Sequence, residues 1–243
     1  MHIIKLNATD STNDYLKQLA TKKELKNFTV VITKTQSRGR GQMGSVWISE
    51  DYKNLTFSIL VKSLNLKIED RFYLSMATSL AIVDALKRFQ IKRLGIKWPN
   101  DILAGNKKIG GILIENILKG PYIESSIIGI GLNVNQIAFT SLPHATSLKN
   151  LTGINYELDA LLSEILKKIK VYLKQVQQRN FISLKRDYEL ELFRKNKPST
   201  FEDESNYRFT AYIQGVTEAG KLSLMLEDNI IKTFDLKEIR LLY

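Results

Sequence analysis

Apolar side chains along the chain follow two spacings, and each spacing predicts one kind of element. Over residues 70–89, Phe72 and Met76 belong to a set of apolar positions that recur three or four residues apart, which is the spacing of one face of an α-helix. Residues 158–179 repeat this pattern. Both segments are therefore predicted to be long amphipathic helices that pack on a sheet, and a shorter helix is expected over residues 181–193.

Runs that alternate or are rich in β-branched residues predict the strands. Six such runs occupy residues 3–6, 28–33, 55–62, 94–98, 109–115 and 122–134. Between the first two runs, Ser11, Thr12 and Asn13 are good N-cap residues, and they precede Leu16 and Leu19 at helical spacing. A further helix is expected there.

The pattern changes after Pro198. Three short strands are predicted, over residues 207–215, 222–228 and 230–234. Closely spaced hairpin strands of this kind differ from the helical segments before them. We therefore place a domain boundary here, and we expect a first domain over residues 1–196 and a small β domain over residues 197–243.

Composition narrows the chemistry. The chain has 243 residues, 44% of them hydrophobic and 25% charged, which is typical of a soluble globular protein. The absence of cysteine excludes disulfides, thiolate catalysis and cysteine metal sites, and only His2 and His144 remain as histidines. No apolar run is long enough to span a membrane and no signal peptide is visible. We expect a cytoplasmic protein without a membrane partner.

The net charge of +11 favours anionic partners. Basic residues are scattered among other residue types, and no basic stripe or known nucleic-acid-binding motif is visible. General lysine-rich usage therefore explains the charge better than a nucleic-acid surface does.

Residues 35–46 form a polar loop with chemistry of its own. Gly39 and Gly41 alternate with Arg38 and Arg40, so backbone N–H groups and guanidinium groups are available to bind a carboxylate or phosphate. The loop matches neither the common mononucleotide nor the dinucleotide phosphate motif. The alternative is a flexible basic surface loop, against which Trp47 at its end indicates a packed segment.

A second candidate segment spans residues 94–116. Lys97 and Lys108 lie among apolar residues, where lysine is uncommon without a partner. Gly110 and Gly111 remove side chains from a predicted strand, which weakens it unless something approaches its backbone closely. An anionic ligand would require this combination. The alternative is an ordinary hairpin, with a polar turn between two strands.

In this order, the segments resemble the motifs of the biotin protein ligases, or biotin–[acetyl-CoA-carboxylase] ligases. Ser11-Thr12-Asn13 is similar to the family's first motif, and Lys97-Trp98-Pro99-Asn100-Asp101 matches its Lys-Trp-Pro-Asn-Asp motif. The other similar segments are the loop from Gln36 to Trp47 with Arg38-Gly39-Arg40-Gly41, Lys108 to Leu113, Gly129 to Asn135 and Ala145 to Leu148. The match is collinear over nearly the whole chain.

The resemblance implies both a reaction and a fold. The substrates and cofactors would be ATP, biotin and Mg²⁺, the intermediate biotinyl-AMP, and the partner a biotin carboxyl-carrier domain of a biotin-dependent carboxylase. The implied fold is α+β, a mixed β-sheet with helices on one side, followed by a small SH3-like β-barrel. From the change of pattern after Pro198, we expect this C-terminal module to be needed for efficient ATP use or acceptor recognition. A homodimer is possible, and specific DNA binding is not expected.

The resemblance also assigns site residues by position. The catalytic residues would be Lys108, Arg40 and Asp101, with Asp101 also the candidate Mg²⁺ ligand. Residues that would bind biotin are Ser11, Thr12, Asn13, Gln36, Gly39, Arg40, Gly41, Gln42, Lys108 and Gly111. Residues that would bind the nucleotide are Arg40, Trp47, Asn100, Lys108 and Asn133.

Two departures from the family pattern are visible. Many members carry a second arginine after Arg40-Gly41 that helps to retain the adenylate, whereas this chain has Gln42. Met1 lies only a few residues before Ser11, so a ligase without an N-terminal DNA-binding domain is expected.

Two alternatives stay open. Lipoate or octanoate ligases and transferases share the implied fold, although the Lys97-to-Asp101 motif favours biotin. A basic nucleic-acid-binding protein would need clustered basic and exposed aromatic residues.

Overall fold

A mixed seven-stranded sheet forms the larger part of the protein, in a computed structural model that describes residues 2–140 and 142–243. The strand order is β1-β2-β3-β7-β6-β5-β4; β1 and β2 are parallel and all other neighbours are antiparallel. The strands are β1 (His2–Thr9), β2 (Thr29–Gln36), β3 (Leu55–Lys67), β4 (Leu94–Lys97), β5 (Asp101–Ala104), β6 (Lys107–Lys119) and β7 (Tyr122–Leu132).

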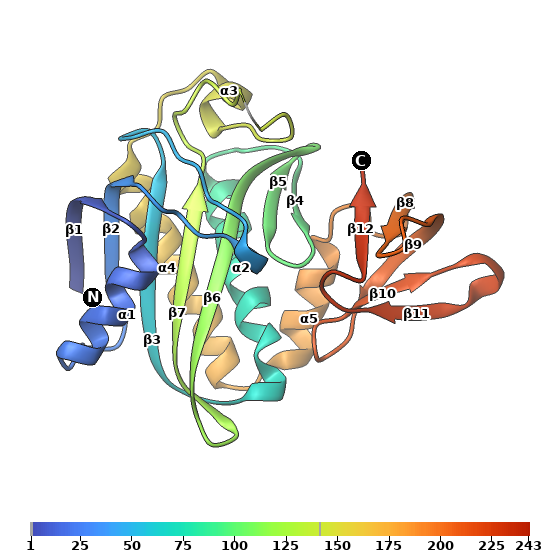
Figure 1. Ribbon diagram of the computed structural model, residues 1–243, viewed down its shortest axis with the longest axis horizontal. Helices are drawn as coiled ribbons and strands as arrows, with labels where there is room; N and C mark the ends of the chain where they lie inside the picture. The colour runs from blue at the N-terminus through green and yellow to red at the C-terminus, as the bar shows by residue number, and fades with distance from the viewer. Residues whose placement is uncertain (1, 141) are drawn as a thin grey trace.

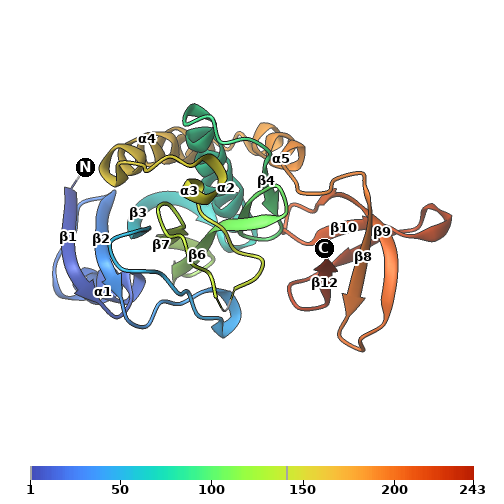
Figure 2. The same ribbon diagram turned by 90° about the horizontal axis from the view of Figure 1, so that it is seen from above.

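Helices cover both faces of this sheet, so the expectation of helices on one side is wrong (Figures 1 and 2). One face carries the predicted helices α2 (Phe72–Arg88), α4 (Leu158–Gln177) and α5 (Phe181–Leu190). The helix α1 (Thr12–Lys22) packs on the opposite face, against β2, β3 and β7. The remaining helical segments are α3 (Leu148–Thr152) and the short 3₁₀ turns η1 (Gln42–Gly44), η2 (Ile68–Asp70) and η3 (Glu227–Asn229).

Side-chain alternation along the central strands separates two cores. On β3, Phe57 and Ile59 belong to the large core beneath α2 and α4. Leu60 points to the other face, where it meets Leu16 of α1 and Ile127 of β7 in a smaller core. Because successive strand residues face opposite ways, the remaining positions on the α1 face of the sheet are available for a site.

The segment predicted as a hairpin with a polar turn contains three strands. The turn prediction between residues 98 and 109 is wrong, because Asp101 to Ala104 form β5 between β4 and β6. The four residues between Asn100 and Gly105 give too short a run for periodicity to detect.

A second, five-stranded antiparallel sheet follows α5, in the order β11-β10-β9-β8-β12. Its strands are β8 (Pro198–Asp203), β9 (Arg208–Val216), β10 (Leu222–Met225), β11 (Ile231–Phe234) and β12 (Ile239–Leu242). The three predicted strands are present. The strands β8 and β12 were not predicted, because β8 begins with proline and is rich in polar residues.

One carboxylate fastens this second sheet to α5. Glu189 accepts a hydrogen bond from the backbone N–H of Val216 at 3.0 Å and pairs with Lys185 at 3.0 Å and Lys195 at 3.4 Å. Burial alone would raise the pKa of Glu189, but these donors outweigh it and lower the pKa. Gly215 leaves the space for this contact, since a Cβ there would lie 2.4 Å from Glu189 Oε1.

In the described ranges, no helix combines the length and the apolar character needed to cross a membrane.

Gly215→Ala is expected to lower the free energy of unfolding by about 1–3 kcal/mol, the usual cost of overpacking a filled site. The matched control is Gly95→Ala in β4, where a Cβ would meet its nearest neighbour, Glu191 O, at an ordinary 3.6 Å. Urea titration of both variants measures the difference. Equal stability of the two variants would show that Glu189 is not held against Gly215.

Candidate functional site

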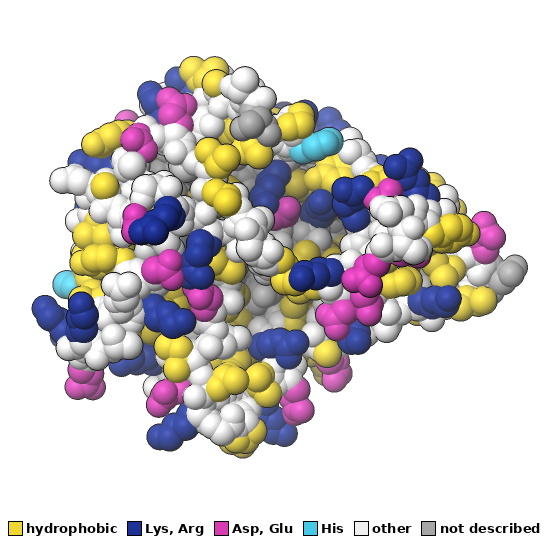
Figure 3. Space-filling model, in the orientation of Figure 1, with side chains coloured by type: hydrophobic (Ala, Val, Ile, Leu, Met, Phe, Trp, Pro, Cys, Tyr) yellow, Lys and Arg dark blue, Asp and Glu magenta, His cyan; other side chains and the backbone are white. Residues whose placement is uncertain are grey.

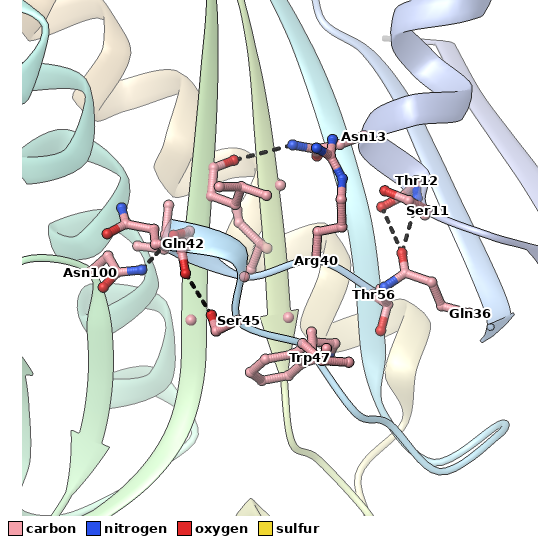
Figure 4. Close-up of a pocket in the computed structure, with 18 of the residues that line it drawn as sticks. Ser11, Thr12, Asn13, Gln36, Arg40, Gln42, Ser45, Trp47, Thr56 and Asn100 are labelled. Atoms are coloured by element: carbon pink, nitrogen blue, oxygen red, sulfur yellow. Dashed lines mark hydrogen bonds between the residues drawn. The ribbon is translucent and has the colours of Figure 1, made fainter. Parts of the chain in front are cut away.

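A cavity of about 250 Å³ lies on the α1 face of the seven-stranded sheet, beneath the loop that joins β2 to β3 (Figure 4). Lys and Arg side chains gather around the hollow seen on this face in Figure 3. Residues from six parts of the chain line the cavity: Ser11, Thr12, Asn13, Gln36, Arg40, Gly41, Gln42, Ser45, Val46, Trp47, Thr56, Asn100, Asp101, Lys108, Gly111, Ile112, Leu113, Gly129, Ile130 and Gly131.

The floor is hollow because the central strands carry small side chains on this face. β3 contributes Thr56, β6 contributes Gly111, and β7 contributes Gly129 and Gly131. A Cβ at Gly129 would lie 2.3 Å from Asn13 Oδ1, and a Cβ at Gly131 would lie 2.3 Å from the Trp47 ring. The glycines therefore admit side chains from α1 and from the loop.

A ligand was expected to approach the backbone at both Gly110 and Gly111, but the two glycines face opposite sides of the sheet. Gly110 faces the other side, where a Cβ would meet Gly131 O at 3.1 Å and Leu132 at 3.2 Å. Of these two glycines, Gly111 lines the cavity and Gly110 does not. Its nearest neighbours are the side chains of Trp47 and Lys108, at 3.4 and 3.5 Å from the position of an added Cβ.

The start of α1 forms one end of the cavity. Ser11 is the N-cap, and its hydroxyl accepts from the backbone N–H of Asp14. The Gln36 carboxamide oxygen accepts from the backbone N–H of Thr12 at 2.9 Å. The buried Ser58 hydroxyl lies 2.7 Å from Thr12 Oγ1 and 2.6 Å from Asn13 Oδ1. These contacts fix the polar groups before any ligand enters.

Arg40 ties the loop down over this end. Its guanidinium donates to Asp14 Oδ1 at 2.6 Å and to Glu115 Oε2 at 2.8 Å. The same Glu115 oxygen accepts from Asn13 Nδ2 at 2.7 Å. The loop is therefore joined to both α1 and β6 by charged hydrogen bonds, which are stronger than neutral ones.

A second cavity, of about 600 Å³, adjoins the first and extends to β12. Trp47, Val46, Asp101 and Lys108 line both cavities. The other lining residues are Ile48, Lys97, Asn133, Leu142, Pro143, His144, Ala145, Arg240, Leu241, Leu242 and Tyr243.

Lys108 lies at the boundary between the two cavities. Its ammonium pairs with Asp101 Oδ1 at 2.6 Å and lies 5.9 Å from the centre of the Trp47 ring. Its backbone N–H donates to His144 O at 2.7 Å, which fixes the strand beneath it. Trp47 Nε1 is buried and has no hydrogen-bond partner within the described protein, so an acceptor at this boundary would satisfy it.

Lys97 contributes a second cationic group to the larger cavity. Its ammonium lies 4.7 Å from the centre of the Tyr243 ring. Burial lowers the pKa of Lys97, and the charges of Lys108 and Arg240 lower it further, whereas Asp101 acts in the opposite direction.

Most of the predicted site residues line one or both cavities. Those at the first cavity are Ser11, Thr12, Asn13, Gln36, Arg40, Gly41, Gln42, Trp47, Asn100, Asp101, Lys108 and Gly111. Asn133 lines the second cavity, and its side chain donates to Thr146 O. Gly39 lines neither cavity; an added Cβ there would lie 2.3 Å from Trp47 O and 2.4 Å from Gln36 Nε2.

Several residues around these cavities were not predicted. Ser58 and Thr56 interrupt the apolar residues of β3, and this interruption was the available signal. Glu115 likewise follows the apolar residues of β6. Arg240 and Tyr243 carried no sequence signal, because only the packing of the second sheet brings β12 to the cavity.

The predicted Mg²⁺ ligand is engaged in a different contact. Asp101 forms the ion pair with Lys108. In the part of the chain that the structure describes, no group of three or more acidic or histidine side chains is placed to hold a metal ion. Mg²⁺, with Asp101 as its ligand, stays a prediction.

Comparisons with solved structures agree with this geometry. The biotin protein ligase of Aquifex aeolicus, solved in complex with biotin and ATP, superposes with a TM-score of 0.83 at 28% identity, covering 99% of this chain and 98% of that one. The mixed sheet with its helices therefore has the biotin ligase fold.

Sequence comparisons point the same way. The bifunctional ligase/repressor BirA of Bacillus spizizenii is 27% identical over 241 residues, which cover 96% of this chain and 72% of that protein. The biotin–[acetyl-CoA-carboxylase] ligase of Mycobacterium tuberculosis is 31% identical over 176 residues, covering 71% and 64%. The sequence profile of the biotin/lipoate A/B protein ligase family matches residues 6–133. The chain belongs to the biotin/lipoate A/B protein ligase family.

Proposed function

We propose that this protein attaches biotin to a lysine of a carboxyl-carrier domain, using ATP and passing through biotinyl-AMP. The observation that carries the proposal is the meeting of two cavities at Lys108 and Trp47. A reaction that joins an acid to a nucleotide needs two binding spaces with a cation at their boundary. The Aquifex aeolicus ligase, which is similar over almost its full length, was solved with both biotin and ATP.

The first cavity takes biotin. Its small volume and its fixed donors and acceptors suit a compact polar ring, which the hydroxyls of Ser11 and Thr12 and the amide of Gln36 would bind. Asn13, Gly41 and Gln42 complete the wall, and Gly39 acts indirectly by letting Gln36 and Trp47 pack closely.

The second cavity takes the nucleotide. Trp47 presents a ring to a base, Asn133 lies in the wall, and Lys97 and Arg240 supply positive charge for phosphates. Asn100 holds the turn before β5, because its side chain donates to Ile112 O at 2.8 Å and its carbonyl accepts from Ile112 N–H at 3.1 Å.

In the first step, a carboxylate oxygen of biotin attacks the α-phosphorus of ATP and pyrophosphate leaves. Negative charge accumulates on the α-phosphate oxygens in the transition state. The Lys108 ammonium has three donors, of which Asp101 engages one. The others can turn to the carboxylate and the phosphate, so the cation is in place before charge develops and little reorganisation is required.

In the second step, the neutral amine of the acceptor lysine attacks the acyl carbon of biotinyl-AMP. The amide bond forms, AMP leaves with the electrons of the broken C–O bond, and the amine loses a proton. Lys108 again lies beside the oxygens that gain charge. Asp101 lies beside Lys108 and is positioned to orient the incoming amine.

Several narrower proposals accompany this function. The five-stranded sheet is an SH3-like barrel, and residues 197–243 form a domain separate from residues 1–196; the two sheets share no strand. Magnesium accompanies the ATP phosphates, the reaction takes place in the cytoplasm, and the protein does not bind DNA specifically. A homodimer stays a prediction.

Incubation with biotin, ATP and a carboxyl-carrier domain is expected to add one biotinyl group to one acceptor lysine, detected by mass spectrometry. Omission of ATP should abolish the addition. Lipoate and octanoate, supplied in place of biotin, test the alternative substrates of this family. Transfer of either acid in preference to biotin would contradict the proposed substrate.

Lys108→Ala is expected to lower the rate of adenylate formation by about 10²-fold, the scale seen when one preorganised donor is removed. Lys108→Arg should restore activity in part, because the planar guanidinium differs from a compact ammonium. Biotin binding without ATP should change less than the rate, since charge grows in the transition state. Biotin-dependent pyrophosphate exchange is the measurement.

The control for this prediction is Lys107→Ala, the neighbouring lysine, whose ammonium lies against Pro143 O and lines neither cavity. A rate for Lys108→Ala that matches this control would place Lys108 outside the reaction.

Thr12→Val is expected to weaken biotin binding roughly fivefold, because one hydrogen-bonding group is worth about 1 kcal/mol, and the loss also removes one of the two partners of the buried Ser58 hydroxyl. The KM for ATP should stay unchanged. Thr21→Val, an exposed position on the same helix, is the matched control. Calorimetric titration with biotin measures the affinity of both variants. Equal affinities of Thr12→Val and Thr21→Val would show that Thr12 does not bind biotin.

A further inference from the structure

Trp98 belongs to the same motif as Lys97, Asn100 and Asp101, yet it lines neither of the two cavities. Its indole N–H points to the second sheet, where it donates to Gly220 O at 2.8 Å. Gly220 lies in the turn between β9 and β10 and has a φ of +88°. A Cβ there would lie 2.2 Å from the Phe72 ring. The acceptor carbonyl is therefore held against α2.

The turn between β4 and β5 is held from several directions. Its two ends are the cross-strand pair Lys97 and Asp101. Within it, Pro99 O accepts a hydrogen bond from the buried Tyr188 hydroxyl at 3.5 Å, and Asn100 is bonded to Ile112. The second sheet touches the turn twice, because the Tyr243 ring also lies against the Lys97 ammonium.

We propose that Trp98 is a positioning residue: its bond to Gly220 lets the second sheet set the position of Asp101 against Lys108 at the boundary of the two cavities. Only two residues separate Trp98 from Asp101, and the Asp101–Lys108 contact of 2.6 Å leaves little tolerance. Misplacement of a reacting group by about 1 Å can cost a rate factor of roughly 10². The inference rests on the proposed function for its kinetic consequence, but its structural part does not.

Trp98→Phe keeps the packed ring and removes the N–H donor. Biotin-dependent pyrophosphate exchange is expected to slow about tenfold, a fraction of the effect of a full misplacement. Biotin affinity should not change, because the contacts among Thr12, Gln36 and Ser58 lie at the other end of the first cavity. Lys221→Ala is the control, since this exposed side chain next to Gly220 pairs with Asp235 inside the second sheet's own unit.

A double-mutant cycle distinguishes positioning from a general loss of structure. If Trp98 acts through Asp101, Trp98→Phe should have almost no further effect on exchange in an Asp101→Asn background. Additive losses, or a parallel loss of biotin affinity, would overturn the proposal. So would an exchange rate for Trp98→Phe equal to that of Lys221→Ala.

A readout without catalysis keeps this test separate from the proposed function. Acylation of Lys108 by a small anhydride, which releases a carboxylate as it reacts with the amine, should be faster by a factor of about two to five in Trp98→Phe, the scale of one partly exposed ion pair. Mass spectrometry quantifies the labelling. Unchanged labelling overturns the positioning role even if the enzyme biotinylates. Absence of exchange in the wild type refutes the proposed function instead.

If Trp98→Phe does not fold, Tyr243→Leu replaces it, because it removes the ring from Lys97 on the same turn. Faster labelling of Lys108 in that variant is expected, and unchanged labelling overturns the proposal.

Discussion

The site depends on the near absence of side chains on one face of three central strands. Where β6 and β7 pass beneath the loop between β2 and β3, that face carries Gly111, Gly129 and Gly131, and β3 carries Thr56. The opposite face of the same strands carries the isoleucines of the large core. A strand can be tightly packed on one side and hollow on the other because its side chains alternate. Replacement of Gly129 would displace Asn13, and replacement of Gly131 would displace the Trp47 ring.

Cations around the two cavities are held by carboxylates from other elements. Arg40 is bound by Asp14 and Glu115, Lys108 by Asp101, and Arg240 by the buried Glu202. The Arg208 hydrogen bond, which outweighs the effect of burial, helps to lower the pKa of Glu202, so this carboxylate stays ionised near neutral pH. Such pairs are worth little for stability when they are partly exposed. Their value here is geometric, since each keeps a mobile charged side chain in one position.

The long elements and the position of the site could be predicted from sequence because each had a strong local signal. The apolar spacing of α2 and α4 extends over several helical turns. Lysines and glycines are uncommon inside apolar strands, so their presence there indicates a site. The strand β5, and the face of the sheet that the predicted helix α1 covers, could not be predicted in the same way. A four-residue strand shows no period, and the face that a short helix covers is decided by tertiary packing.

The roles of individual residues were harder to predict than their membership of the site. The sequence singles out Gly110 and Gly111 equally, but strand alternation gives only Gly111 to the cavity. Trp98 shows the same limit, since its motif suggests a ligand whereas its indole binds the second sheet. Contacts that join distant segments, such as Arg240 with the cavity near Lys97, depend on the docking of two sheets and leave no trace in local sequence.

The two edges of the seven-stranded sheet differ in a way that bears on assembly. At β4, the backbone of Ile96 is already bonded to the segment after α5, through Glu191 O at 2.7 Å and Phe193 N–H at 2.8 Å. That edge is closed to another strand. At β1, the other edge, β2 is the only paired neighbour among the described residues, and the lysine at position 5 is of the kind that discourages unplanned pairing. Growth of the sheet by strand addition, from a second copy or another chain, is therefore directed to β1.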